Sequence, residues 1–225
     1  MASPEQVPDA TATRLVAEHA YEELRDRIVT LGLPPGTVLR EDELMGEMGI
    51  GRTPLREAVK RLALENLVEV QPRRGTFVTA VEAADIQNIT EVRAELEGYA
   101  AELAALRLDP DTRAAAEALR KEVEELGPQE QQRLMGVDER IHRFTWGAAH
   151  NPYLAQTLER YFTHSLRIWY LVLDGVPTLG HSVHDQTQLL DAILDRNGSH
   201  ACTIMREHVL AFQREILTAF SKKVT

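Results

Sequence analysis

Three side chains in the C-terminal half of the chain could together bind a divalent metal ion. Asp138 and His142 are four residues apart in a segment with helical spacing, so both project from one face of that helix. His208 lies in the last helical segment of the chain. Carboxylate oxygens and imidazole nitrogens are common ligands of zinc and similar ions, and the facing helices of a bundle can bring them together. The competing interpretation is that these histidines make ordinary hydrogen bonds in the core or at the surface.

A second group of residues could bind nucleic acid. The segment 52–65 has the spacing of an amphipathic helix, with Pro54 in its first turn, where proline is tolerated. Its apolar face holds Leu55, Ala58, Val59 and Leu62, and its polar face holds Arg52, Thr53, Arg56 and Lys60. Arginine can donate two hydrogen bonds to one guanine edge, and threonine can donate to a phosphate. Because an isolated helix of this kind is more often an ordinary solvated surface, the neighbouring segments must decide.

Those neighbours predict a helix-turn-helix. A helix, a short helix, a glycine turn and the amphipathic helix follow one another, at residues 15–31, 41–48, 49–51 and 52–65. Gly49 and Gly51 allow the backbone angles that a tight turn needs. Either Gly51 or Thr53 could be the N-cap of the last helix. In such a motif the second helix of the pair lies in the major groove of DNA.

A predicted hairpin completes a winged version of this motif. Residues 68–70 and 76–78 alternate like two short strands. The turn between them contains Arg73, Arg74 and Gly75. Arginines at a hairpin tip suit contacts with phosphates or with a narrow minor groove.

The remainder of the chain has helical spacing throughout. Six helices are expected, at residues 83–108, 111–126, 129–149, 152–173, 178–196 and 199–220, and each break contains a proline, a glycine or both. The expected fold is therefore mainly α. It comprises a disordered N-terminus over 1–13, a winged helix-turn-helix DNA-binding domain over 14–80 and an all-α helical bundle over 83–221 that binds an effector.

Composition constrains the class of protein without deciding it. The net charge of −10 argues, by itself, against DNA binding, but residues 52–74 hold six basic side chains against three acidic ones. Cys202 is the only cysteine, which excludes an internal disulfide framework and suits a reducing cytosol. The longest apolar stretch near the middle is far shorter than a bilayer span. We therefore expect a cytoplasmic protein with no membrane partner.

The N-terminal region resembles the GntR family of transcription regulators. The residues that carry the resemblance are Pro35-Gly36-Thr37-Val38-Leu39, Glu43-Leu44, Gly51-Arg52-Thr53-Pro54-Leu55-Arg56-Glu57-Ala58, Leu62 and Arg74-Gly75-Thr76-Phe77-Val78. The resemblance implies DNA contacts by Arg52, Thr53, Arg56 and the wing residues Arg74 and Gly75. The chain departs from the family at Gly51, where Ser or Thr is common, and near Glu43, where a basic residue is often found.

The C-terminal region resembles the FCD effector domain of the FadR-like branch of that family. The resemblance spans residues 83–220 and rests on Val92-Arg93, Leu96-Glu97, Asp138, His142, Phe144, Asn151-Pro152, Met205 and His208. Many FCD domains bind a divalent metal with one Asp and three His. The resemblance also implies that Arg93 faces the same cavity, where its guanidinium could bind a carboxylate. The alternative for Arg93 is an ion pair with Glu97 on its own helix.

The fourth metal position of the family falls on a different residue type here. Counting back from His208 places the family's remaining histidine at Gln186, and a neutral amide oxygen is a poor zinc ligand. Three outcomes are open. The site is weaker and completed by Gln186 or water, a two-residue shift of register brings in His184, or the metal has been lost and the effector binds directly.

These features predict a homodimeric repressor that is not an enzyme. Its affinity for operator DNA would respond to a small carboxylate metabolite in the helical domain, with or without a divalent metal such as zinc. One alternative is a regulator for which the metal ion itself is the signal. A metal-dependent hydrolase is the other alternative, but the sequence has no HExxH-type pair, nucleophile motif or dedicated general base.

Overall fold

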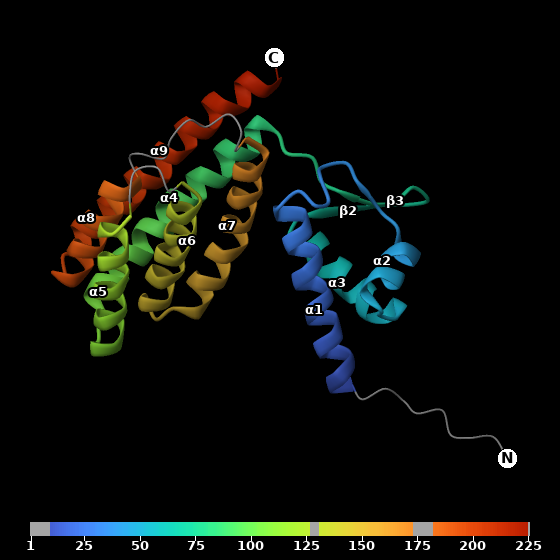
Figure 1. The fold of residues 1–225 in the computed structure, drawn as a ribbon, viewed down its shortest axis with the longest axis horizontal. Helices are drawn as coiled ribbons and strands as arrows, with labels where there is room; N and C mark the ends of the chain where they lie inside the picture. The colour runs from blue at the N-terminus through green and yellow to red at the C-terminus, as the bar shows by residue number, and fades with distance from the viewer. Residues whose placement is uncertain (1–9, 127–130, 173–181, 225) are drawn as a thin grey trace. The chain divides into compact units, whose positions relative to one another are not determined.

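The computed structural model describes residues 10–126, 131–172 and 182–224 (Figure 1). Contacts within the chain divide it into two compact units, Met1–Val81 and Glu82–Thr225. The first unit combines helices with a small sheet, and the described part of the second is helical. The mainly α fold predicted from the sequence is confirmed.

The N-terminal unit has the predicted order of elements. It comprises α1 (Ala10–Val29), β1 (Val38–Leu39), α2 (Glu41–Met48), α3 (Arg52–Leu64), β2 (Val68–Gln71) and β3 (Gly75–Val78). The antiparallel sheet has the order β1-β3-β2. Its hairpin register pairs Val68 with Val78 and Gln71 with Gly75. The hairpin and the helix pair together form a winged helix-turn-helix.

Local sequence explains the geometry of the turn between α2 and α3. Gly49 ends α2 in the left-handed conformation, with φ 65°, which glycine adopts at low cost. Gly51 is the N-cap of α3, so Thr53 is not. Buried side chains from α1 and α3, including Leu24, Ile28 and Leu62, share one core. The turn and this core fix the exposed face of α3.

The C-terminal unit is a bundle of helices around α4. Its elements are α4 (Ala83–Leu106), α5 (Pro110–Glu124), α6 (Gln131–Ala148), α7 (Pro152–Val172), α8 (Ser182–Leu194) and α9 (Gly198–Val224). Helix α4 packs against α6, α7, α8 and most extensively α9 (Figure 1). Two helix starts have capping boxes, Glu82 with Asp85 and Asp109 with Thr112. Apolar residues from α4, α5, α6, α8 and α9 form the largest core cluster.

Small residues allow α4 and α9 to approach closely. Ala94, Ala101 and Ala105 of α4 and Ala201 of α9 are all buried in the core. A Cβ atom added to Gly98 would lie 2.5 Å from Cγ of Arg206 and 3.2 Å from the carbonyl oxygen of Cys202. Because the carbonyl belongs to the backbone of α9, a larger residue at position 98 would push the two helices apart.

Several predicted boundaries need correction. Helix α1 begins at Ala10, so residues 10–13 are helical and not part of a disordered N-terminus, whereas residues 1–9 lie outside the described part of the chain. The strand Val38–Leu39 was not predicted, because two residues are too short to show alternation. The predicted helix start at 178 falls among residues that are not described. No helix in the described ranges has the length and apolarity required to cross a bilayer.

The close approach of α4 to α9 makes position 98 sensitive to size. We expect Gly98→Val to lower the free energy of unfolding by about 1–3 kcal/mol, because the added methyl groups overpack the contact with α9. Gly147→Val is the matched control, since Gly147 is also helical but has no atom within 4 Å of its added Cβ. We expect this control to change stability by less than about 0.5 kcal/mol. Urea denaturation measures both, and equal effects would contradict the packing argument.

Candidate functional site

The predicted recognition helix presents its basic face to solvent. Arg52, Thr53, Arg56 and Lys60 are all exposed on α3. On the opposite face Leu55, Ala58 and Leu62 are fully buried in the N-terminal core, and Val59 is half-buried against it. The amphipathic spacing in the sequence therefore divided the helix correctly into a packed and an accessible face.

Acidic side chains of α2 pair with two of these arginines. Arg52 Nη2 lies 3.2 Å from Asp42 Oδ1, and Arg56 Nε lies 3.2 Å from Glu41 Oε2. Both arginine side chains remain more than half exposed. Exposed ion pairs contribute about 0–1 kcal/mol, so a DNA phosphate can compete for either guanidinium. Glu43, the departure noted in the sequence, instead faces Arg40 at 3.6 Å.

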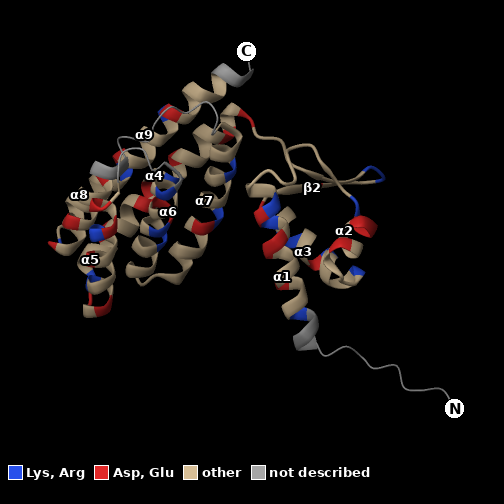
Figure 2. Ribbon diagram, viewed as in Figure 1, with Lys and Arg blue, Asp and Glu red and all other residues tan. Residues whose placement is uncertain are grey.

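The hairpin tip places a second group of basic residues in solvent. Arg73 and Arg74 are exposed between β2 and β3, and Figure 2 shows this tip as a basic point at the end of the sheet. Arg73 and Gly75 have φ values of 65° and 108°, which turn the chain sharply. Gly75 adopts such angles without steric cost. The tip can therefore carry both arginines on a short, sharply turned loop.

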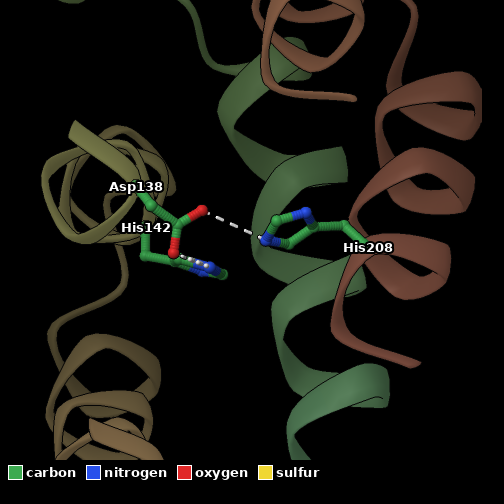
Figure 3. A group of neighbouring side chains, drawn as sticks. All are labelled: Asp138, His142 and His208. Carbon is green, nitrogen blue, oxygen red and sulfur yellow. Dashed lines mark ion pairs between the residues drawn. The ribbon is translucent and has the colours of Figure 1, made fainter. Parts of the chain in front are cut away.

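In the helical unit, the structure brings the three predicted metal ligands together (Figure 3). Asp138 and His142 project from α6, and His208 approaches them from α9. The two oxygens of Asp138 face different imidazoles: Oδ2 lies 3.6 Å from His142 Nε2, and Oδ1 lies 3.2 Å from His208 Nε2. One ligand atom from each residue falls within 4.8 Å of the other two.

Gln186 is a fourth residue that contacts this cluster. It is buried on α8, and its Nε2 donates to Asp138 Oδ1 at 2.6 Å. The count back from His208 thus identified a residue that contacts the site. His184 lies one half-turn earlier on α8, but its side chain is outside the described part of the chain.

Glu97 is a member of the site that the sequence suggested only as a partner for Arg93. It is completely buried on α4, where its Oε1 accepts hydrogen bonds from Arg93 Nε (2.8 Å) and Nη2. Its Oε2 accepts from His142 Nδ1 and from Trp146 Nε1 (3.3 Å). The i, i+4 spacing of Arg93 and Glu97 in the sequence indicated the ion pair between these two residues. The contacts with α6 depend on how the helices pack, and no sequence spacing revealed them.

The electrostatic environment keeps these buried groups charged. Burial would raise the pKa of Glu97, but the charges of Arg93 and His142 outweigh it and bring this pKa down to about 2. Burial opposes the charged form of Asp138 in the same way, and His142 and His208 hold its pKa below the usual range. Burial would lower the pKa of His208, yet the neighbouring Asp138 raises it overall. The cluster therefore contains two ionised carboxylates surrounded by cationic or polar donors.

A small cavity connects the metal-ligand cluster with Arg93. Its lining includes Arg93, Asp138, His142, Phe162 and His208, and its volume is about 20 Å³. The guanidinium of Arg93 lies over the ring of Phe162, 4.9 Å from the ring centre. A cavity needs about 10–15 Å³ to hold one water molecule, so this one accommodates an ion or a water.

The donor chemistry of the cluster fits a divalent metal ion. Two imidazole nitrogens and a carboxylate are a typical set of three protein ligands for zinc and similar ions. Because Glu97 accepts from Nδ1 of His142, the Nε2 atom of that ring is the one that faces Asp138. Gln186 can offer only an amide oxygen, so the fourth position is weaker than a histidine would make it.

Comparisons with known proteins match both units of the chain. Residues 16–78 match the bacterial regulatory proteins of the gntR family, and residues 88–211 match the FCD domain. An HTH-type transcriptional regulator of Streptomyces ambofaciens is 30% identical over 193 residues, covering 85% of this chain and 80% of that protein. The HTH-type transcriptional repressor RspR of Escherichia coli is 24% identical over 198 residues, covering 88% and 87%.

A solved structure agrees with the fold. McbR/YncC of Escherichia coli superposes with a TM-score of 0.71 at 22% identity, covering 88% of this chain and 97% of that one. At this identity the likeness concerns the fold alone. With the family matches over both units, the conclusion is that the chain belongs to the GntR family of bacterial regulatory proteins and carries a C-terminal FCD domain.

Proposed function

We propose that this regulator is a homodimeric repressor whose affinity for operator DNA is controlled by a small carboxylate bound beside a divalent metal in the FCD domain. Residues 14–80 would bind DNA and residues 83–221 would bind the effector. The observation that carries the proposal is the convergence of Asp138, His142 and His208 beside Arg93 in one cavity. The repressor assignment follows the name of the Escherichia coli relative.

On the DNA side, the proposed contacts are the exposed basic and polar residues of α3 and the wing. They are Arg52, Thr53, Arg56, Lys60, Arg73, Arg74 and Gly75. The α3 residues suit base edges and phosphates of the major groove, and the wing residues suit adjacent phosphates or the minor groove. Since the chain carries a net charge of −10, this local basic surface must provide the attraction to DNA.

On the effector side, the proposed ligands divide between the metal and the carboxylate. Asp138, His142 and His208 would hold the metal, with Gln186 or water at the fourth position. The metal would supply a positive charge to which a carboxylate oxygen can bind. Arg93 would contact the same carboxylate, and it would share its guanidinium with Glu97, to which Nε and Nη2 already donate.

The size of the cavity favours one second candidate, a regulator for which the metal ion is itself the signal. About 20 Å³ suffices for an ion with little rearrangement. Operator titrations with chelated and with zinc-loaded protein separate the two functions. A large change in operator affinity with zinc alone supports the ion as signal, and no change until a carboxylate is added supports the organic effector.

The DNA-binding proposal predicts the effect of removing Arg56. We expect Arg56→Ala to weaken specific operator binding by about 1–3 kcal/mol at fixed salt, because a base contact is lost. Arg140→Ala is the control, since Arg140 is an exposed arginine on α6 that pairs with Glu122. Fluorescence anisotropy with the promoter fragment measures both, and circular dichroism verifies folding. If the Arg56 variant bound the operator as tightly as the control, α3 would not read the DNA in the proposed way.

The metal proposal predicts a gain of affinity when the fourth position becomes histidine. We expect Gln186→His to raise zinc affinity on the order of tenfold, since imidazole is a better zinc ligand than an amide oxygen. Gln188→His adds the same side chain at an exposed position of α8 and should leave the affinity unchanged. Competition with a chromophoric chelator measures both constants. Unchanged affinity in the Gln186 variant would place this residue outside the ligand shell.

A further inference from the structure

Glu97 touches both halves of the proposed effector site, although it is neither a metal ligand nor a lining residue of the cavity. One of its oxygens accepts two hydrogen bonds from Arg93, and the other accepts from Nδ1 of His142. Trp146 donates to the second oxygen as well, at 3.3 Å. All of these partners are buried, so bulk water does not compete for these hydrogen bonds.

The bond from His142 to Glu97 determines which ring nitrogen can act as a ligand. Of the two nitrogens of a neutral imidazole, one carries a proton and the other a lone pair. When Nδ1 donates to Glu97, the lone pair resides on Nε2, which faces Asp138. A carboxylate behind a ligating histidine fixes both the tautomer and the ring orientation in this way.

Only a carboxylate satisfies both partners of Glu97 at once. Arg93 and the Nδ1–H of His142 are both donors, and a carboxylate accepts on both of its oxygens. An amide in the same place accepts at one end and donates at the other. It would either face Arg93 with its NH₂ group or force a lone pair onto Nδ1 of His142, which moves the proton to the nitrogen that faces Asp138.

We infer that Glu97 is a positioning residue that sets the tautomer of His142 for metal binding and, through its second oxygen, links that state to Arg93. Metal binding and the placement of the carboxylate-binding arginine are thus coupled through one side chain. This inference rests on the proposed function of the cluster. It adds a residue that acts through its neighbours and touches neither metal nor effector.

The test compares Glu97→Gln with Glu95→Gln in the full-length protein. Glu95 is on the same helix but exposed and paired with Arg206, so its variant loses the same charge without altering the site. We expect Glu97→Gln to weaken zinc binding about 10–100-fold, as loss of such a supporting carboxylate typically does, and Glu95→Gln to have no effect. Nitrogen-15 NMR of the histidine rings in metal-free protein, recorded at alkaline pH where the imidazole rings are neutral, reads the tautomer directly. His142 should carry its proton on Nδ1 in the wild type and on Nε2 in the Glu97 variant.

The two readouts separate failure of this inference from failure of the proposed function. Wild-type protein that does not bind zinc, yet shows the expected change of tautomer, contradicts the metal proposal and leaves the role of Glu97 in orienting His142 supported. Zinc binding and a tautomer that are both the same in wild type and Glu97→Gln overturn the inference. If that variant does not fold, Glu97→Asp is the second variant. It retains the negative charge, but its side chain is one methylene shorter and should no longer accept the hydrogen bond from Nδ1 of His142.

The link to Arg93 has its own measurement. Arg93→Met should strengthen zinc binding in the wild-type background, because the negative charge of Glu97 is then no longer neutralised by the guanidinium. In the Glu97→Gln background the same substitution should have a clearly smaller effect. A double-mutant cycle of zinc affinities isolates this difference. Equal effects in both backgrounds would show that Glu97 does not transmit any influence between the two residues.

Discussion

The close packing of α4 against α9 is the constraint on which the effector unit depends. Small residues on both helices allow this approach, and a Cβ atom added at Gly98 would lie 3.2 Å from a backbone oxygen of α9. The polar residues Arg93 and Glu97 of α4 are also buried, so their polar atoms need partners within the protein or in the small cavity that Arg93 lines. The partners are His142 and Trp146 on α6, and α9 adds His208 beside them. The helical bundle thus buries these groups together, and their contacts with one another satisfy them.

The DNA-binding unit has the opposite electrostatic character. Its ion pairs, Arg52 with Asp42 and Arg56 with Glu41, are exposed, and exchange with solvent and salt makes them weak. Under the proposed function, phosphates of the operator would therefore replace the acidic partners at small cost. The net negative charge and the acidic residues that pair with these arginines should weaken binding to unrelated DNA. The protein would then bind its operator more selectively, at the cost of a lower overall affinity for DNA.

The sequence predicted those parts of the structure that depend on local spacing. The two faces of α3, the glycine turn and the i, i+4 pairs Asp138–His142 and Arg93–Glu97 all follow from helical geometry. It did not predict the bonds of Glu97 to His142 and Trp146, because these depend on the rotation and depth of α6 against α4. Likewise, β1 owes its existence to pairing with β3, and its two residues carry no pattern of their own. The spacing of residues within one segment does not reveal how distant segments pack against each other.

The small volume of the cavity constrains any mechanism of regulation. A ligand shifts a conformational equilibrium only by the difference between its affinities for the two states. A carboxylate that displaces Phe162 or neighbouring lining residues when it binds would favour the displaced state. Such movement acts on α7 and α9, which carry Phe162 and His208 and pack directly on α4. Helix α4 begins at Ala83, directly after the first unit ends at Val81, so any movement of α4 is close in sequence to that unit.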